Sequence, residues 1–168
     1  MGQPKGELVV GGERLLDRAV RTLRDGGCNP VLAVVREGVE VTGAGVVVNP
    51  APERGQRSSL ELAVAAAAGS DALAVMLVDV PGVGADAVRR VVEAWRPGRI
   101  GVAAYAGRRG HPTVMSVDHW REALALAGPD EGARVFLREH AHLVDEIAVP
   151  GDPADLDTPD DLARWTAP

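Results

Sequence analysis

Apolar positions along the chain follow two alternating patterns, short continuous runs and one-sided repeats of three or four residues. The continuous runs predict strands, and the repeats predict helices that bury one face. Strands are expected at residues 31–35, 46–48, 73–78, 99–105, 112–116 and 144–149, and helices at 15–23, 58–68, 85–95, 118–127, 131–140 and 158–165. This alternation predicts one α/β domain over residues 1–168, with a mostly parallel sheet and helices on both of its faces.

The pattern also predicts burial and capping. The run at 73–78 contains no polar residue, which is typical of a strand buried on both faces. Ser58 or Ser59 is expected to cap the second helix, and Asp118 the fourth.

The composition narrows the kind of core and the kinds of partner. Apolar residues make up 46% of the chain but aromatic residues only 3%, so the core must consist of Val, Leu and Ala. A formal net charge of -6 offers no basic surface for nucleic acid. The single cysteine, Cys28, excludes an intrachain disulfide framework and a cysteine-based zinc site. No apolar run approaches the roughly 20 residues that span a bilayer and no signal peptide is recognised, so we expect a cytoplasmic protein without membrane segments.

Carboxylates at predicted strand and helix ends are the first candidates for chemistry, because α/β sheets bind ligands at the carboxyl ends of their strands. Asp79 follows the long apolar run, where its carboxylate suits Mg²⁺ or only starts a turn. The segment Asp155–Leu162 places further carboxylates at the last predicted helix. Asp157 or Thr158 can be the N-cap of that helix, and Asp157 can also share a metal with Asp79.

The other candidates are weaker when taken singly: Asn49, Gly55, Ser58, Ser59, His111, Arg134 and Lys5. The first four lie where a predicted strand meets a helix N-terminus, whose amides favour anions, although a satisfied loop and cap is the simpler explanation. The histidine and arginine can belong to a turn and a solvated helix start. The lysine can neutralise phosphates or simply face solvent.

Several familiar catalytic motifs do not occur in the sequence. Gly82-Val83-Gly84 lacks the third glycine of a dinucleotide fingerprint, and there is no Walker lysine loop, no Gly-x-Ser-x-Gly elbow and no paired-histidine zinc motif. Nucleotidyl transfer needs none of these, because the attacking oxygen belongs to the second substrate and the protein supplies position and charge stabilisation.

The order of the short motifs resembles the MobA-like NTP transferase family, whose members attach GMP or CMP to molybdopterin. The matching segments are Met1-Gly2-Gln3-Pro4-Lys5, the Gly-Gly turn and helix within Leu8 to Leu23, Asn49, Gly55, Ser58-Ser59-Leu60, Asp79-Val80-Pro81, Gly110-His111-Pro112, Gly132-Ala133-Arg134 and Asp155 to Leu162. These segments cover essentially the whole chain. They are more similar to the cytidylyltransferase branch than to the guanylyltransferase branch.

The resemblance implies a Rossmann-like, nucleotide-diphospho-sugar-transferase-like fold. It also implies Mg²⁺-dependent transfer of a nucleotide from CTP or GTP, with CTP favoured, to a phosphorylated acceptor such as molybdopterin. Pyrophosphate is then released, and a molybdoenzyme is a candidate protein partner. By motif, the catalytic residues are Lys5 and Asp79, and the metal ligands are Asp79 and Asp157. The nucleotide contacts are Lys5, Asn49, Gly55, Ser58 and Ser59, and the acceptor contacts are His111 and Arg134.

The sequence departs from the family pattern at its start. The family begins with a strand and a glycine-rich loop, Leu-Ala-x-Gly-x-x-x-Arg, which would precede Met1. Since that strand lies in the middle of the family's sheet, its loss is expected to expose two inner edges. We therefore expect this exact chain to have weak or no transferase activity.

Two other functions remain open. Gly82-Val83-Gly84 and Asp118-His119-Trp120 are similar to segments of relatives named nicotine blue oxidoreductase, a function that would require NAD(P)H. The missing loop is consistent with a non-catalytic molybdenum-cofactor binding protein. The retained lysine and aspartates argue against that function. Sugar-nucleotide pyrophosphorylases share the fold and opening motif but fit the Gly-His-Pro segment less well.

Overall fold

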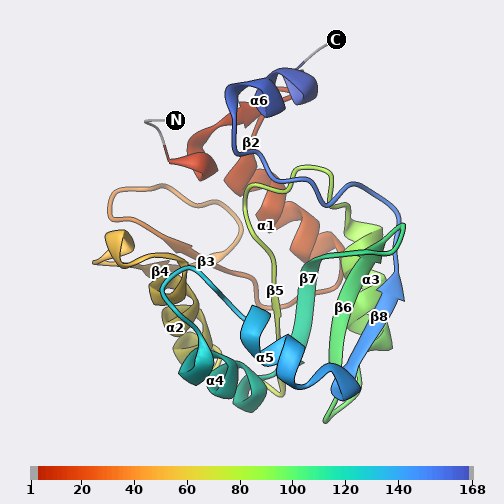
Figure 1. The fold of residues 1–168 in the computed structure, drawn as a ribbon. Coiled ribbons are helices and arrows are strands. Elements are labelled where there is room, and N and C mark those ends of the chain that lie inside the picture. The colour runs from red at the N-terminus through yellow and green to blue at the C-terminus, as the bar shows by residue number, and fades with distance from the viewer. Residues whose placement is uncertain (1–3, 167–168) are drawn as a thin grey trace.

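The computed structural model describes residues 4–166, which form helices packed around a divided sheet (Figure 1). The helices are α1 (Leu15–Asp25), α2 (Gln56–Ala66), α3 (Ala85–Ala94), α4 (Val117–Leu126), α5 (Arg134–Glu139) and α6 (Pro159–Thr166), with short 3₁₀ turns η1 (Lys5–Glu7), η2 (Pro52–Arg54) and η3 (Ala141–Leu143). The strands are β1 (Val9–Val10), β2 (Glu13–Arg14), β3 (Leu32–Val35), β4 (Gly45–Val48), β5 (Ala72–Val75), β6 (Ile100–Tyr105), β7 (Arg108–Ser116) and β8 (Val144–Ala148). No helix within the described range is long and apolar enough to cross a bilayer.

The sheets are mixed, so the prediction of a mostly parallel sheet was wrong. The largest sheet has the order β5-β7-β6-β8, in which β7 runs antiparallel to both neighbours while β6 and β8 are parallel. The physical reason is the tight turn between β6 and β7, where Ala106 and Gly107 both have positive φ, 49° and 83°. A two-residue turn of this kind joins antiparallel strands, whereas a parallel connection needs a long crossover.

The sheet is divided between β3 and β5, which matches the two exposed inner edges expected from the resemblance. Strands β3 and β4 form a separate parallel pair. Among the described residues, β3 pairs only with β4 and β5 only with β7, which leaves one edge of each strand without a strand neighbour. Strand β5 ends at Val75 rather than residue 78, and its four residues are half-buried rather than buried on both faces. Its free edge explains this lower burial.

Helices cover both faces of the sheets, as predicted. Helices α1 and α3 contact each other on one face, where Val88 and Val91 are fully buried. On the other face α2, α4 and α5 pack together around Phe136 and Trp120. The indole N–H of Trp120 donates to the Leu73 carbonyl at 2.8 Å, which fixes α4 against β5.

Several element boundaries differ from the sequence-based prediction. Helix α2 begins at Gln56, before Ser58 and Ser59, so neither serine is its N-cap. Helix α4 is capped by Ser116 rather than Asp118, because the Ser116 hydroxyl accepts a hydrogen bond from the His119 amide at 3.1 Å. Strand β7 starts four residues earlier than expected, and α5 starts three residues later.

Candidate active site

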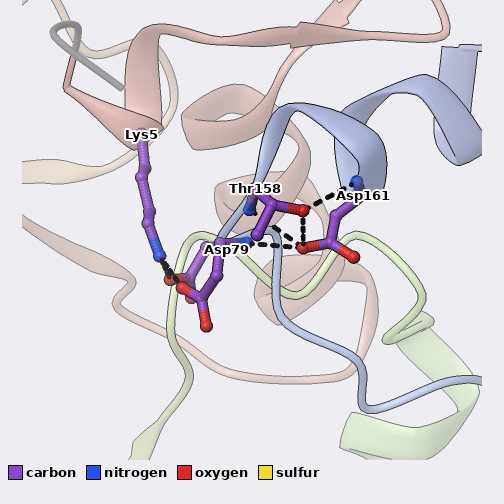
Figure 2. Close-up of polar contacts among 5 residues, drawn as sticks. Lys5, Asp79, Thr158 and Asp161 are labelled. Carbon is purple, nitrogen blue, oxygen red and sulfur yellow. Dashed lines mark hydrogen bonds and ion pairs between the residues drawn. The ribbon is translucent and has the colours of Figure 1, made fainter.

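Lys5, near the amino end of the chain, contacts Asp79 from the middle of the chain (Figure 2) and Asp157 from near its carboxyl end. Its Nζ donates to Asp79 Oδ2 at 2.7 Å and to Asp157 Oδ1 at 2.5 Å. The Asp79 side chain is only 15% exposed, that of Lys5 is 35% exposed and that of Asp157 is 67% exposed. The structure thus brings together three of the predicted site residues, and Lys5 is not merely solvated. Met1, Gly2 and Gln3 of the same motif lie outside the described residues.

A small apolar cluster holds segments near the two ends of the chain against the turn after β5 that contains Asp79. Val10, Leu15 and Leu156 are almost completely buried in this cluster. Leu156 also donates its amide to the Asp79 carbonyl at 2.9 Å. Because Leu156 immediately precedes Asp157, this contact places the Asp157 carboxylate beside Lys5.

The start of α6 fixes the backbone around Asp157. The Thr158 amide donates to Asp161 Oδ2 at 2.9 Å, and the Asp161 amide donates back to Thr158 Oγ1 at 3.2 Å (Figure 2). This reciprocal arrangement is a capping box with Thr158 as the N-cap. The Asp157 amide also donates to Asp161 Oδ2, at 3.3 Å, which leaves the Asp157 carboxylate free to face Lys5. Capping and site roles therefore fall on different side chains.

The charges of the cluster shift the pKa values of two of its members. Partial burial alone would lower the pKa of Lys5. The hydrogen bonds to Asp157 and Asp79 have the opposite and larger combined effect, so the pKa of Lys5 is raised. Partial burial, followed by the charges of Asp79 and Asp157, raises the pKa of Asp155. Asp155 is thus a further site residue, which the sequence analysis placed in a candidate segment without giving it a role. Its place two residues before Asp157 was the available signal.

One oxygen of the cluster has no hydrogen-bond partner among the described residues. Asp79 Oδ1 is buried, although a buried carboxylate oxygen without a partner is costly. Two carboxylates already converge on the Lys5 ammonium, and the unpaired oxygen leaves Asp79 able to bind a second cation. No group of three or more His, Cys, Asp or Glu side chains that could hold a metal occurs within residues 4–166. Two carboxylates suit Mg²⁺, which usually keeps several waters and shares substrate phosphates.

His111 and Arg134 lie on the second side of the site. His111 is a half-buried residue in the middle of β7 rather than in a turn, and its Nδ1 lies 3.3 Å from the Val75 carbonyl. Burial lowers its pKa, and the charges of Asp155, Asp79 and Arg134 all act on it. Burial therefore favours the neutral form of the ring, and the charges of Asp155 and Asp79 oppose this shift. Arg134, the first residue of α5, is exposed.

Asn49, Ser58 and Ser59 form a hydrogen-bonded group at the end of β4. Asn49 Nδ2 donates to Ser58 Oγ at 2.9 Å and to Ser59 Oγ at 3.0 Å, while Asn49 Oδ1 accepts from the Ala51 amide. Asn49 is only 3% exposed. The group joins the strand end to the first turn of α2, so its first effect is structural. Whether it also contacts a nucleotide stays a prediction.

Gly55 precedes α2 with a φ of 87°, a conformation that strongly favours glycine. A Cβ at this position would lie 2.5 Å from Asp130 Oδ1 and 2.8 Å from the Pro129 carbonyl. The Asp130 carboxylate accepts from the Gln56 amide at 3.3 Å. The motif glycine is therefore required by local packing at the helix N-terminus.

Close backbone approach explains Gly82, the first glycine of the Gly82-Val83-Gly84 segment. A Cβ on Gly82 would lie 2.5 Å from the Asp152 carbonyl oxygen, and the Asp152 amide donates to the Gly82 carbonyl at 3.1 Å. Gly82 thus lets the segment that leads to Asp157 pass directly over the Asp79 turn. This packing accounts for the glycine without a dinucleotide.

The fold and this cluster define an α/β protein with polar and charged residues gathered where strand β5 ends, the usual ligand position in such sheets. The chain belongs to the MobA-like NTP transferase family, because the domain of that description matches residues 1–144.

Three proteins similar to this chain show how closely it resembles characterised relatives in sequence and structure. The chain is 34% identical over 177 residues to a nicotine blue oxidoreductase of Paenarthrobacter nicotinovorans, covering 96% of this chain and 87% of that protein. It is 34% identical over 112 residues to a probable molybdenum cofactor guanylyltransferase of Opitutus terrae, covering 63% of this chain and 54% of that protein. The crystal structure of Rv0371c of Mycobacterium tuberculosis in complex with manganese is 28% identical, with a TM-score of 0.81 over 97% of this chain and 91% of that chain.

Proposed function

We propose that the protein transfers a nucleoside monophosphate from an NTP, with CTP favoured over GTP, to a phosphorylated acceptor of the molybdopterin type. An acceptor phosphate oxygen attacks the α-phosphorus, the bond from that phosphorus to the bridging oxygen breaks, and pyrophosphate leaves. The observation that carries this proposal is the Lys5 ammonium held between Asp79 and Asp157 at the end of β5. The relative described as a probable molybdenum cofactor guanylyltransferase supports the class of acceptor.

Asp79 and Asp157 are the residues proposed to hold Mg²⁺. The fit rests on the buried, unpartnered Asp79 Oδ1 and on the convergence of both carboxylates on one cation. When bound, Mg²⁺ would supply positive charge that stabilises the negative charge on the phosphates. The manganese in the Rv0371c structure supports a divalent ion in this family.

Lys5 is proposed to bind the nucleotide phosphates. Its ammonium is a compact cation with three donors, two of which contact the carboxylates here. A lysine is charged at neutral pH, and hydrogen bonds to Asp157 and Asp79 raise the pKa of Lys5 further. Cationic groups aimed at the leaving phosphates lower the energy of the transition state when they are held in place beforehand.

His111 and Arg134 are proposed to orient the acceptor. A neutral imidazole can donate one hydrogen bond and accept another, so His111 can position a polar acceptor without repelling Lys5. Arg134 is exposed and can pair with an acceptor phosphate in bidentate geometry. On the nucleotide side, the amides at the start of α2 and the Asn49, Gly55, Ser58 and Ser59 group are proposed to contact the nucleotide.

A second function, reduction of a nicotine blue-like pigment with NAD(P)H, is favoured by the relative that is 34% identical over 96% of this chain. The two functions differ in the ligand they require. Release of pyrophosphate from CTP in the presence of molybdopterin and Mg²⁺, lost in Asp79→Asn and kept in Asp118→Asn, supports the transferase. Oxidation of NADPH by the pigment, without any release of pyrophosphate from CTP or GTP, contradicts it.

A further inference from the structure

The side chain of Arg18, on helix α1, links the two segments that carry Lys5 and Asp79. Its Nη1 donates to the Pro81 carbonyl at 3.2 Å, and its Nη2 donates to the Val10 carbonyl at 3.3 Å. Pro81 lies two residues after Asp79, and Val10 lies five residues after Lys5. One guanidinium group therefore holds the backbone on both sides of the Lys5–Asp79 ion pair.

The surroundings of Arg18 keep its guanidinium group in this position. The side chain is only 24% exposed, and Nε lies 3.4 Å from Glu13 Oε2 in an ion pair. Nε is also buried, and it has no hydrogen-bond partner within residues 4–166. Because an unpaired buried donor is costly, the two carbonyl contacts rather than the pairing of Nε determine where the guanidinium group lies.

The backbone around these contacts is closely packed. A Cβ on Gly11 would lie 3.6 Å from Arg18 Nη2, so the turn between β1 and β2 lies directly against the guanidinium group. Val10 is 1% exposed and packs in one cluster with Leu156, the neighbour of Asp157. A shift of the Arg18 contact is therefore passed to the segments that lead to the candidate site.

The turn that contains Asp79 is held from two elements. Arg18 reaches the Pro81 carbonyl from α1, and the Leu156 amide donates to the Asp79 carbonyl at 2.9 Å from the segment before α6. The second contact fixes the turn relative to Asp157. The first fixes it relative to β1, which follows the 3₁₀ turn that carries Lys5.

We propose that Arg18 is a positioning residue, which sets the distance between the Lys5 ammonium and the Asp79 carboxylate through the carbonyls of Val10 and Pro81. Its role toward a triphosphate rests on the proposed function, whereas the placing of Lys5 can be measured without any ligand. Displacing a binding group by about 1 Å can lower a rate by about a hundredfold. Arg18 thus acts on the site from a distance, through the backbone.

The first test measures how firmly Lys5 is held. Lys5 is the only lysine in the sequence, so ¹³C labelling of lysine reports on this side chain alone. NMR relaxation gives the order parameter of its Cε in the unaltered chain, Arg18→Met and Arg21→Met. Arg21 is the matched control, because it lies on the same helix and also pairs with Glu13.

We expect Lys5 Cε to lose order in Arg18→Met and to keep it in Arg21→Met. Lower global stability alone does not change fast motion within the folded state, so this readout separates positioning from a merely structural role. Arg18→Gln is the second variant, in case Arg18→Met does not fold, since its shorter side chain cannot span both carbonyls. Equal order at Lys5 in the unaltered chain and the Arg18 variants would overturn the proposal.

The second test is calorimetric titration of CTP in the presence of Mg²⁺. Arg18→Met should weaken binding about tenfold or more, and Arg21→Met should bind as tightly as the unaltered chain. Equal weakening by both variants, or none in Arg18→Met, would also overturn the proposal. If none of the chains binds a triphosphate but Lys5 loses order only in the Arg18 variants, the proposed function fails and the positioning of Lys5 by Arg18 stands.

Discussion

At the scale of single residues, Lys5 serves as the cation that compensates Asp79 and Asp157. Both ion pairs have short distances, but only Asp79 is well shielded from solvent. Replacing the lysine leaves the largely buried Asp79 carboxylate without its cation. Loss of this ion pair is therefore expected to lower stability more than loss of the exposed pair with Asp157.

Lys5→Met should lower the free energy of unfolding by about 1 kcal/mol, since solvent already screens a lysine that is 35% exposed. Mn²⁺ should then raise the melting temperature of this variant more than that of the unaltered chain, because the ammonium no longer competes for the carboxylates. Thermal denaturation with and without Mn²⁺ measures both effects.

The control is Arg90→Met, which removes an exposed ion pair with Asp86. An equal response to Mn²⁺ in the unaltered chain and Lys5→Met would argue against a metal site at these aspartates.

His111 should make stability depend on pH in the acid range. Burial lowers its folded pKa below the ordinary value of 6.5, so the unfolded chain binds a proton that the folded chain resists. Stability contributed by the neutral ring is present above pH 6.5 and is lost as the pH falls below it. Urea denaturation between pH 7.5 and 5 should therefore show a smaller loss of stability in His111→Gln than in the unaltered chain. An identical slope in the two proteins would show that His111 titrates freely.

Most residues of the Lys5 cluster could be predicted, because the resemblance supplied their order along the chain. The spacing alone left Asp79 as either a ligand or a turn residue, and Asp157 as either a cap or a ligand. Only the folded chain separates these roles, by giving the cap to Thr158 and directing Asp157 to Lys5. Asp155 was missed because its proximity to Asp79 depends on how residues 150–157 cross the Asp79 turn.

At the scale of secondary structure, the hydrophobic pattern predicted the elements better than it predicted their starts. Helix α1 and strand β6 match the expected ranges closely because their apolar residues are buried as the periodicity requires. The starts of α2 and α4 were misplaced because backbone geometry decided them. At α2, Gly55 ends the preceding loop in a conformation open mainly to glycine. At α4, Ser116 provides the cap two residues before the expected Asp118.

Gly55→Ala should destabilise the start of α2. Its positive φ strains any side chain, by about 1–3 kcal/mol, and the new Cβ would also overlap Asp130 and the Pro129 carbonyl. Gly69→Ala is the matched control, because a Cβ there meets no atom within 4 Å. Chemical denaturation should show a clear loss of stability for Gly55→Ala and little change for Gly69→Ala. Equal stabilities would mean that the loop relaxes without cost.

At the scale of the whole molecule, the main feature is the division of the sheet between β3 and β5. The alternating pattern predicted one continuous, mostly parallel sheet, and the resemblance predicted two exposed inner edges. The second prediction was confirmed and the first was wrong. The antiparallel β7 could not be inferred from apolar runs, since a run shows that a strand exists but not the direction of its neighbours.

We expect the chain to turn over slowly as a transferase, because β5 leads directly to Asp79 and one of its edges is unpaired. Steady-state rates of pyrophosphate release with CTP, molybdopterin and Mg²⁺ measure this turnover. Robust turnover by the chain without added residues would contradict this expectation.

The central claim is that Asp79, Asp157 and Lys5 form a metal-dependent nucleotide site. Calorimetric titration of CTP, GTP and NADPH into the chain, with and without Mg²⁺, tests it most directly, using Asp79→Asn and the exposed Asp118→Asn as the paired variants. The account predicts Mg²⁺-dependent binding that is strongest for CTP, kept in Asp118→Asn and weakened about tenfold or more in Asp79→Asn, which corresponds to about 1.4 kcal/mol or more. Triphosphate binding that is unchanged in Asp79→Asn, or binding of NADPH alone, would contradict it.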